Sequence, residues 1–247
     1  MISTRRLSLA GGVAYLLTFA FSIPAFFLYE PALTDAAYII GDGAADTRVI
    51  LGAFLEMLTA LAGIGTAIAL YPVIRRQSEA LSVGFVSTRI FEAAVMMFGV
   101  IALLALVTMR QDGAVPGNDD TTMLGIGQLL VVVRDHSARL GPGFVPVLNA
   151  LCLGYVLFRS RLVPRLIPAL GLIGAPLLLA SVVGRIFGLH TDESVFAAIA
   201  LPAIFFWELS VGLWLTFKGF NAAALHTLGF DSGASTTDRT VVADGGA

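Results

Sequence analysis

Four ionisable side chains lie inside stretches that are otherwise apolar enough to cross a membrane: Glu56, Arg89, Glu92 and Glu208. A charged group at the centre of a bilayer costs about 2.5–3.5 kcal/mol on insertion scales, and such residues usually face a bundle interior or a polar cavity. Asn149 is a further polar group within an apolar segment. These five residues form the candidate intramembrane polar site.

The balance of charge among these residues allows two interpretations, a binding site or a structural cluster. One Arg against three Glu leaves carboxyls without a counter-charge, and desolvation favours their neutral, proton-carrying form. We therefore predict that Glu92 or Glu208 holds a proton at neutral pH, as a site for a proton or a small solute would require. The alternative is structural, because a buried Arg–Glu cluster can simply fix helix register and partner choice. Both interpretations stay open at this point.

Depth along the helices separates these residues into two levels. At a rise of about 1.5 Å per residue, Arg89 lies roughly 12 Å and Glu208 roughly 15 Å from the inner edge of the membrane. Arg89 and Glu92 share one helix face at i, i+3 spacing, so Glu208 can meet Arg89 if their helices pack together. Glu56 instead lies in the outer half.

Small residues accompany two of the carboxyls at helical spacing. Glu56 shares a face with Ala60, Gly63 and Ala67, and Glu208 shares one with Gly212. Small residues let membrane helices approach closely. We therefore expect both carboxyls to point into the bundle, with Glu56 on a close-packing face.

The composition of the chain defines its class. Of 247 residues, 57% are hydrophobic and 13% charged, with a mean hydropathy of +0.88, whereas soluble domains carry about 25% charged residues. This composition predicts an integral membrane protein. The net charge is −2 and no Lys/Arg block is present, which argues against a nucleic-acid partner.

Apolar segments long enough to cross about 30 Å as helix predict an all-α, polytopic bundle of six transmembrane helices in a single domain, residues 1–220. The expected spans are 7–29, 49–73, 81–108, 140–158, 166–187 and 194–217. The segment 121–133 is short for a span, and we expect an additional helix over about 121–138 that lies on, or dips into, the outer face.

Loop charges set the expected orientation. With six spans and a cytoplasmic N-terminus, the inner side carries most of the Lys and Arg residues and the outer loops are rich in Asp and Glu, which is a positive-inside pattern. Both termini are then cytoplasmic. Residues 221–247 are polar and rich in small residues, and we expect a disordered cytoplasmic tail.

The known catalytic and cofactor motifs are absent from the sequence. It contains no phosphate-binding glycine loop, nucleophile elbow, HExxH pair or paired-cysteine site. We expect no metal site, no cofactor and no enzymatic activity. The lipid bilayer is the expected partner, while a small-molecule ligand or a protein partner stays open.

Several stretches resemble a bacterial multi-pass membrane family catalogued as domain of unknown function 4386. They are YPVIRRQSEALSVGFVSTRIFEA (71–93), LGPGFVPVLNALCLGYVLFRSRLVPRLIPALGLIG (140–174), WELSVGLWLTFKGF (207–220) and an opening Arg-Leu-x-x-Ala-Gly-Gly. The resemblance implies a six-span protein of a bacterial cytoplasmic (inner) membrane, and implies no catalytic residue. The biochemical function is therefore unknown. The alternatives are a small-molecule or proton-coupled transporter and a non-enzymatic accessory or structural protein acting through a partner.

Overall fold

The computed structural model describes residues 3–112, 119–189 and 195–230, with side chains omitted for 195–200. These residues are helical, with no strand among them. The helices are α1 (Thr4–Thr34), the short 3-10 helix η1 (Tyr38–Ile40), α2 (Asp46–Ile74), α3 (Glu79–Gln111), α4 (Asp120–Leu140), α5 (Val145–Ser160), α6 (Leu166–Ile186), α7 (Val195–Phe217) and α8 (Ala222–Thr227).

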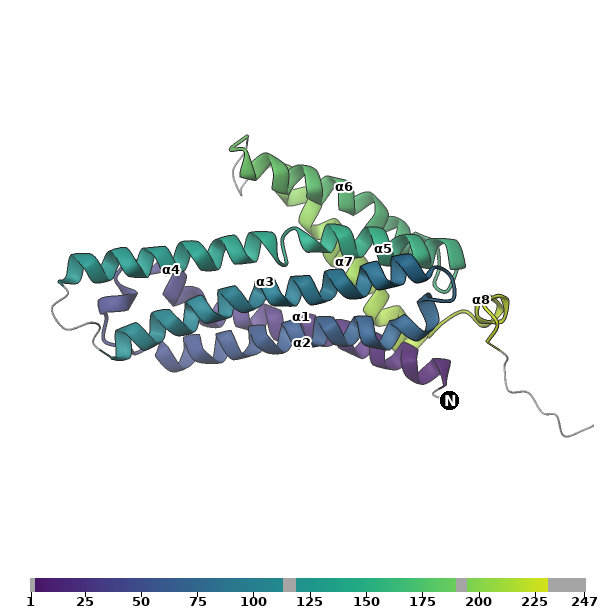
Figure 1. The fold of residues 1–247 in the computed structure, drawn as a ribbon, viewed down its shortest axis with the longest axis horizontal. Coiled ribbons are helices and arrows are strands. Elements are labelled where there is room, and N and C mark those ends of the chain that lie inside the picture. The colour runs from purple at the N-terminus through teal and green to yellow at the C-terminus, as the bar shows by residue number, and fades with distance from the viewer. Residues whose placement is uncertain (1–2, 113–118, 190–194, 231–247) are drawn as a thin grey trace, which may run out of the picture.

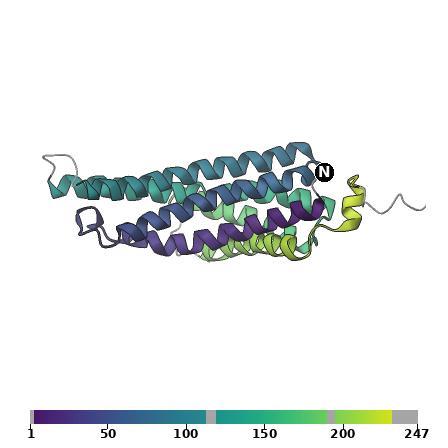
Figure 2. The ribbon, with the colours of Figure 1, turned by 90° about the horizontal axis from the view of Figure 1, so that it is seen from below.

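The principal contacts between helices form a closed ring. Within the described residues, α1 packs on α2, α2 on α3, α3 on α5, α5 on α6, α6 on α7, and α7 returns to α1. α4 packs on α3 outside this ring and continues the line of α5, as Figure 1 shows. The view in Figure 2 shows α1, α2 and α3 running side by side along the length of the molecule.

The helices have the length and composition of membrane spans. Five segments of the described chain are long and apolar enough to cross a bilayer: Thr4–Thr34, Asp46–Ile74, Glu79–Gln111, Asp120–Ser160 and Leu166–Ile186. The part of α7 from Leu201 to Phe217 is also apolar but shorter. Large apolar side chains such as Phe27, Ile68 and Phe98 are more than 60% exposed. This outward apolar surface is what a helix facing lipid requires.

Two apolar cores lie toward opposite ends of the bundle. One is built around Tyr15, Phe85, Leu153 and Trp207, and the other around Tyr29, Val49, Leu103 and their neighbours. Between them is a smaller cluster of Ala60, Ala93 and Met96. These three residues also line the central cavity described below, so the cavity separates the two cores.

A break in the helix lies near the expected start of the fourth span. The predicted span at 140–158 begins inside a break, because α4 ends at Leu140 and α5 starts only at Val145. Gly141, Pro142 and Gly143 occupy this break, and a Cβ at Gly143 would collide with the Arg139 carbonyl group. Proline interrupts the helical hydrogen-bond ladder, so the Gly-Pro-Gly sequence divides one long segment.

The segment in which an additional outer helix is expected forms α4, which packs on the bundle. α4 lies along α3, and the Ser137 hydroxyl accepts a hydrogen bond of 3.0 Å from the Gly99 amide. Ser137 also donates to the Val95 carbonyl at 2.5 Å. α4 is therefore tied to the middle of α3.

The start of the predicted disordered tail is folded. Residues 222–227 form α8, whose Asn221 N-cap accepts a hydrogen bond from the Ala223 amide, and Ala224 is buried. Leu225, Leu228 and Phe230 pack against the nearby core, which explains why this segment is ordered. Residues 231–247 lie outside the described residues.

Candidate functional site: an ion-pair cavity inside the bundle

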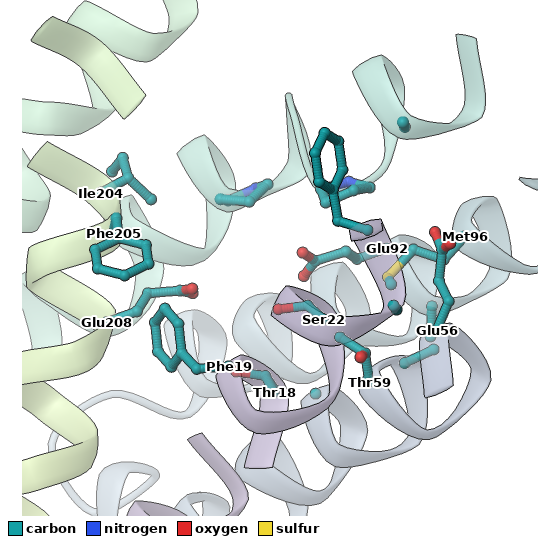
Figure 3. A pocket seen from close by; sticks show the side chains of 18 of the residues that line it. Thr18, Phe19, Ser22, Glu56, Thr59, Glu92, Met96, Ile204, Phe205 and Glu208 are labelled. Atoms are coloured by element: carbon teal, nitrogen blue, oxygen red, sulfur yellow. The ribbon is translucent and has the colours of Figure 1, made fainter. Parts of the chain in front are cut away.

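A cavity of about 420 Å³ lies between the helices at the level where the two apolar cores separate. Its described lining comes from α1, α2, α3, α4, α5 and α7 and from the break between α4 and α5. Four of the five predicted site residues line it, namely Glu56, Arg89, Glu92 and Glu208. In Figure 3 the carboxyl ends of Glu92 and Glu208 point toward one another across this space.

The first group of polar side chains is centred on Arg89 of α3. Its Nη1 donates to Glu92 Oε2 at 3.0 Å, and its Nη2 donates to Glu208 Oε1 on α7 at 2.5 Å. Arg89 is only 4% exposed. The predicted meeting of Arg89 with Glu208 is therefore present, and the pair joins α3 to α7.

Asn149 completes this group from α5. Its Nδ2 donates to Glu92 Oε2 at 2.7 Å, while its Oδ1 accepts from the Thr88 hydroxyl at 2.6 Å. Asn149 is fully buried but lies behind Glu92, outside the cavity lining. It thus orients the Glu92 carboxylate from the far side.

The second group contains Glu56 of α2 and a residue that the sequence analysis did not select. Arg134 of α4 donates from Nη2 to Glu56 Oε2 at 2.9 Å and to the Tyr29 hydroxyl of α1 at 2.6 Å. Both charged side chains are at least nine-tenths buried. This group joins α1, α2 and α4.

Arg134 corrects the expected charge balance. The described lining holds two guanidinium groups and three carboxyls, so one carboxyl is in excess and not two. Two features of the sequence could have indicated Arg134. It directly follows an apolar run, and it shares helical spacing with Met123, Gly127 and Ser137, which the structure shows to be the buried face of α4. The expectation that this helix lies on, or dips into, the outer face gave no reason to place Arg134 in the cavity.

The small-residue face near Glu56 also has a different role from the one expected. A Cβ placed on Gly63 would find no atom within 4 Å, and Ala60 and Gly63 line the cavity. This part of α2 therefore borders open space and is not a close helix contact. Gly212, by contrast, does lie in a close contact, where a Cβ would stand 3.0 Å from Tyr15 Cβ of α1.

The two groups are displaced from each other along the bundle. Arg134 lies level with Gly99 of α3, because a Cβ on Gly99 would stand 3.1 Å from Arg134 Cδ. Gly99 is seven residues beyond Glu92, which corresponds to about 10 Å of helix. The cavity thus extends from one ion pair to the other. Thr18, Ser22 and Thr59 add hydroxyl groups to its wall, and Figure 3 shows these side chains between Glu208 and Glu56.

Aromatic rings support both cations. The Arg89 guanidinium carbon lies 5.2 Å from the ring centre of Tyr15, and that of Arg134 lies 4.6 Å from the ring centre of Tyr29. Cation–π contacts become stronger in a desolvated setting. Both arginines are therefore held as cations from two sides, by a carboxylate and by a ring.

A third charged group lies at the far end of the bundle and does not line the cavity. Asp46 at the start of α2 pairs with Arg110 at the end of α3 and accepts from Gln111 at 2.8 Å. The Tyr38 hydroxyl donates to Asp46 at 2.9 Å, and burial raises the pKa of Tyr38 well above its usual value. This group fastens η1 to the ends of α2 and α3.

Apolar helices long enough to cross a bilayer fit an integral membrane protein, and paired charges line a cavity between its helices. The chain belongs to the family described as domain of unknown function 4386, whose model matches residues 10–219. It matches no curated protein and no solved structure. The family membership agrees with the expected resemblance.

Proposed function

We propose that the protein is a non-enzymatic membrane carrier that binds a small cationic solute, or a proton in its place, inside the cavity. The observation that carries this proposal is that both ion-pair groups line one cavity with one carboxyl in excess. A charge at this depth needs a counter-charge. Either a proton or a cationic solute would neutralise the excess carboxyl. Replacement of one by the other in the cavity would couple the movement of the solute to that of protons.

The cavity suits a small solute in size and lining. Its volume of about 420 Å³ falls within the roughly 300–1,000 Å³ that is usual for small-molecule sites. Phe19, Phe26, Phe205 and Met96 supply apolar wall, and the carboxyls supply the polar contacts. This combination favours an organic cation over a bare metal ion.

We further propose six membrane crossings, with α4 and α5 crossing together. The 16 residues of α5 rise only about 24 Å, less than a hydrocarbon core of about 30 Å. The last turns of α4 would supply the missing length. In this arrangement the end with Arg5, Arg75, Arg161 and Lys218 faces the cytoplasm of a bacterial inner membrane.

Ethidium, an aromatic cation, is a suitable probe for the cavity. We expect the purified protein to release protons into a weakly buffered solution when it binds ethidium. Glu92→Gln and Glu208→Gln should each weaken ethidium binding at least about tenfold, because each removes one charge-assisted contact. Acidification should weaken binding, because a proton competes for the same carboxyl. Fluorescence titration measures both effects.

Two further variants test whether the cavity itself is the site. Gly63→Leu fills open space and should abolish ethidium binding while leaving the protein folded. Glu79→Gln removes an exposed carboxyl at the start of α3 and should change nothing. Undiminished binding by Gly63→Leu, or equal losses in Glu79→Gln and Glu92→Gln, would refute the proposal.

A purely structural role is the second candidate, and one observation favours it. The charged side chains of the cavity form hydrogen bonds between helices. The group around Arg89 joins α3, α5 and α7, and the group around Arg134 joins α1, α2 and α4. In that case Glu92→Gln and Glu208→Gln would lower the amount of folded protein in the membrane. A carrier would instead lose binding at unchanged abundance.

A further inference from the structure

A second hollow lies at the end of the bundle where α5 turns into α6 and α7 leads into α8. Its volume is about 610 Å³, and three of its lining residues are basic: Arg161, Arg165 and Lys218. None of the three forms an ion pair with a carboxyl among the described residues. Positive charge is therefore gathered around an open space without a counter-charge from the part of the chain that the structure describes.

The walls of this hollow are joined by backbone contacts. The Asn221 amide donates to the Leu162 carbonyl at 2.9 Å, which fastens the start of α8 to the α5–α6 turn. Leu162 and Val163 are buried beneath the turn. The cations from two distant parts of the chain are thus held on one framework.

The backbone of Arg161 is unusual for its residue type. Arg161 has φ 57° and is the one non-glycine residue with positive φ in the described chain. It follows α5 at the position where helices commonly end in glycine, and the left-handed region costs other residues about 1 kcal/mol or more. An arginine kept where glycine would suit the fold better indicates a use for its side chain.

Helix geometry adds to the positive potential. α6 begins at Leu166, and its N-cap residue Arg165 provides no side-chain hydrogen bond to the first amides. The positive end of the helix dipole attracts anions. This helix start offers few free amides, because the Ile167 amide donates to the Pro164 carbonyl at 3.0 Å and Pro168 has no N–H. The Arg165 guanidinium is positioned over the Phe158 ring at 5.1 Å, beside this helix start.

The location identifies the source of the anion. The hollow lies at the ends of apolar helices, where lipid headgroups would meet the protein, and its lining includes Trp214 and Phe220. Tryptophan is enriched at the membrane–water boundary. We propose that this hollow binds the phosphate group of an anionic phospholipid, with Arg161, Arg165 and Lys218 as its ligands.

Lipid binding to the whole protein tests this assignment. The full chain in a neutral detergent is titrated with short-chain phosphatidylglycerol, short-chain phosphatidylcholine or inorganic phosphate, with Trp fluorescence as the readout. We expect phosphatidylglycerol to bind about tenfold or more tightly than phosphatidylcholine, as clustered basic residues at a headgroup require. Inorganic phosphate should bind far more weakly than phosphatidylglycerol. Binding of phosphate alone with equal strength would assign the site to a soluble anion and overturn the lipid proposal.

Matched triple variants separate the hollow from the general charge of this end. R161Q/R165Q/K218Q should lose the preference for phosphatidylglycerol, whereas R6Q/R75Q/R76Q removes the same charge outside the hollow and should retain it. Equal losses in the two triple variants would contradict a specific site.

A single substitution at Arg161 gives an independent test. Arg161→Gly should raise the midpoint of thermal unfolding, because glycine suits the backbone, and should still weaken phosphatidylglycerol binding. An Arg161→Gly protein that binds phosphatidylglycerol as the wild type does would also contradict the assignment.

Discussion

At the scale of single residues, Arg134 determines how charge is balanced in the cavity. Its guanidinium neutralises the Glu56 carboxylate of α2, and its hydrogen bond to the Tyr29 hydroxyl links α4 to α1 as well. Removal of one partner from a buried ion pair leaves the other charge uncompensated, which is far more costly than loss of both. The Glu56–Arg134 pair can therefore be dissected by a double-mutant cycle.

We expect Arg134→Gln to lower the free energy of unfolding by about 3 kcal/mol or more. Addition of Glu56→Gln to that variant should recover much of the loss, because no unpaired charge is then left. Thermal unfolding in detergent measures the change, and Arg75→Gln at an exposed position serves as the control. Equal stability of single and double variants would contradict the pairing.

The sequence allowed part of this site to be predicted at the residue scale. Arg89, Glu92 and Glu208 could be grouped because helical spacing and distance from the membrane edge are readable from a single sequence. Arg134 could not be paired with Glu56, because that contact joins residues 78 positions apart on helices whose packing order local spacing does not encode.

At the scale of elements, glycine determines how closely α1 and α7 approach. A Cβ on Gly12 would stand 2.5 Å from Thr216 N and Oγ1 and 2.8 Å from the Gly212 carbonyl oxygen. Backbone atoms cannot move away without shifting a helix. The close contact of α1 with α7 closes the ring and places Glu208 within reach of Arg89.

Gly12→Ala should therefore destabilise the protein by about 1–3 kcal/mol, the usual cost of overpacking. Gly65→Ala is the matched control, since a Cβ there would meet only Ala14 Cβ at 3.7 Å. That variant should be neutral or stabilised by up to about 1 kcal/mol through helix propensity. Unfolding of both variants gives the comparison, and an unaffected Gly12→Ala protein would contradict the close crossing.

Helices could be predicted at this scale, whereas the exact position of the α4–α5 break could not, because the span expected from residue 140 begins as α5 only at Val145. Runs of apolar residues identify spans because length and composition suffice. In the sequence alone, Gly-Pro-Gly at 141–143 is compatible with the start of a new span and also with a break inside one long helical segment. Only the packing of α4 on α3 distinguishes these cases.

At the scale of the whole molecule, the two ends of the bundle differ in charge. The end shown with the N-terminus and α8 in Figure 1 carries Arg5, Arg6, Arg75, Arg76, Arg159, Arg161, Arg165 and Lys218, with Glu79 as its described carboxylate. Acidic side chains exceed basic ones at the opposite end, where Glu30, Asp35, Asp42, Asp46, Asp112, Asp119 and Asp120 lie together with Arg48 and Arg110. This difference supports an orientation with the basic end inside.

Cysteine labelling should reveal that orientation. In a Cys152→Ser background, Asp112→Cys should react with a membrane-impermeant maleimide added outside the cells, and Ala80→Cys at the other end of α3 should react only after lysis. Leu140→Cys on the exposed face of the last turn of α4 should be protected if this turn is embedded with α5. Labelling of Ala80→Cys from outside would reverse the orientation, and rapid labelling of Leu140→Cys would place the end of α4 in water.

The proposal that the cavity holds an excess carboxyl which exchanges its proton with solvent is tested most directly by infrared difference spectroscopy of the purified protein on exchange from H2O to D2O. We predict a protonated-carboxyl band at neutral pH that shifts on exchange and is lost in Glu92→Gln or Glu208→Gln, but not in Glu79→Gln. A spectrum in which all carboxyls are ionised, or a band that does not exchange, would contradict the account.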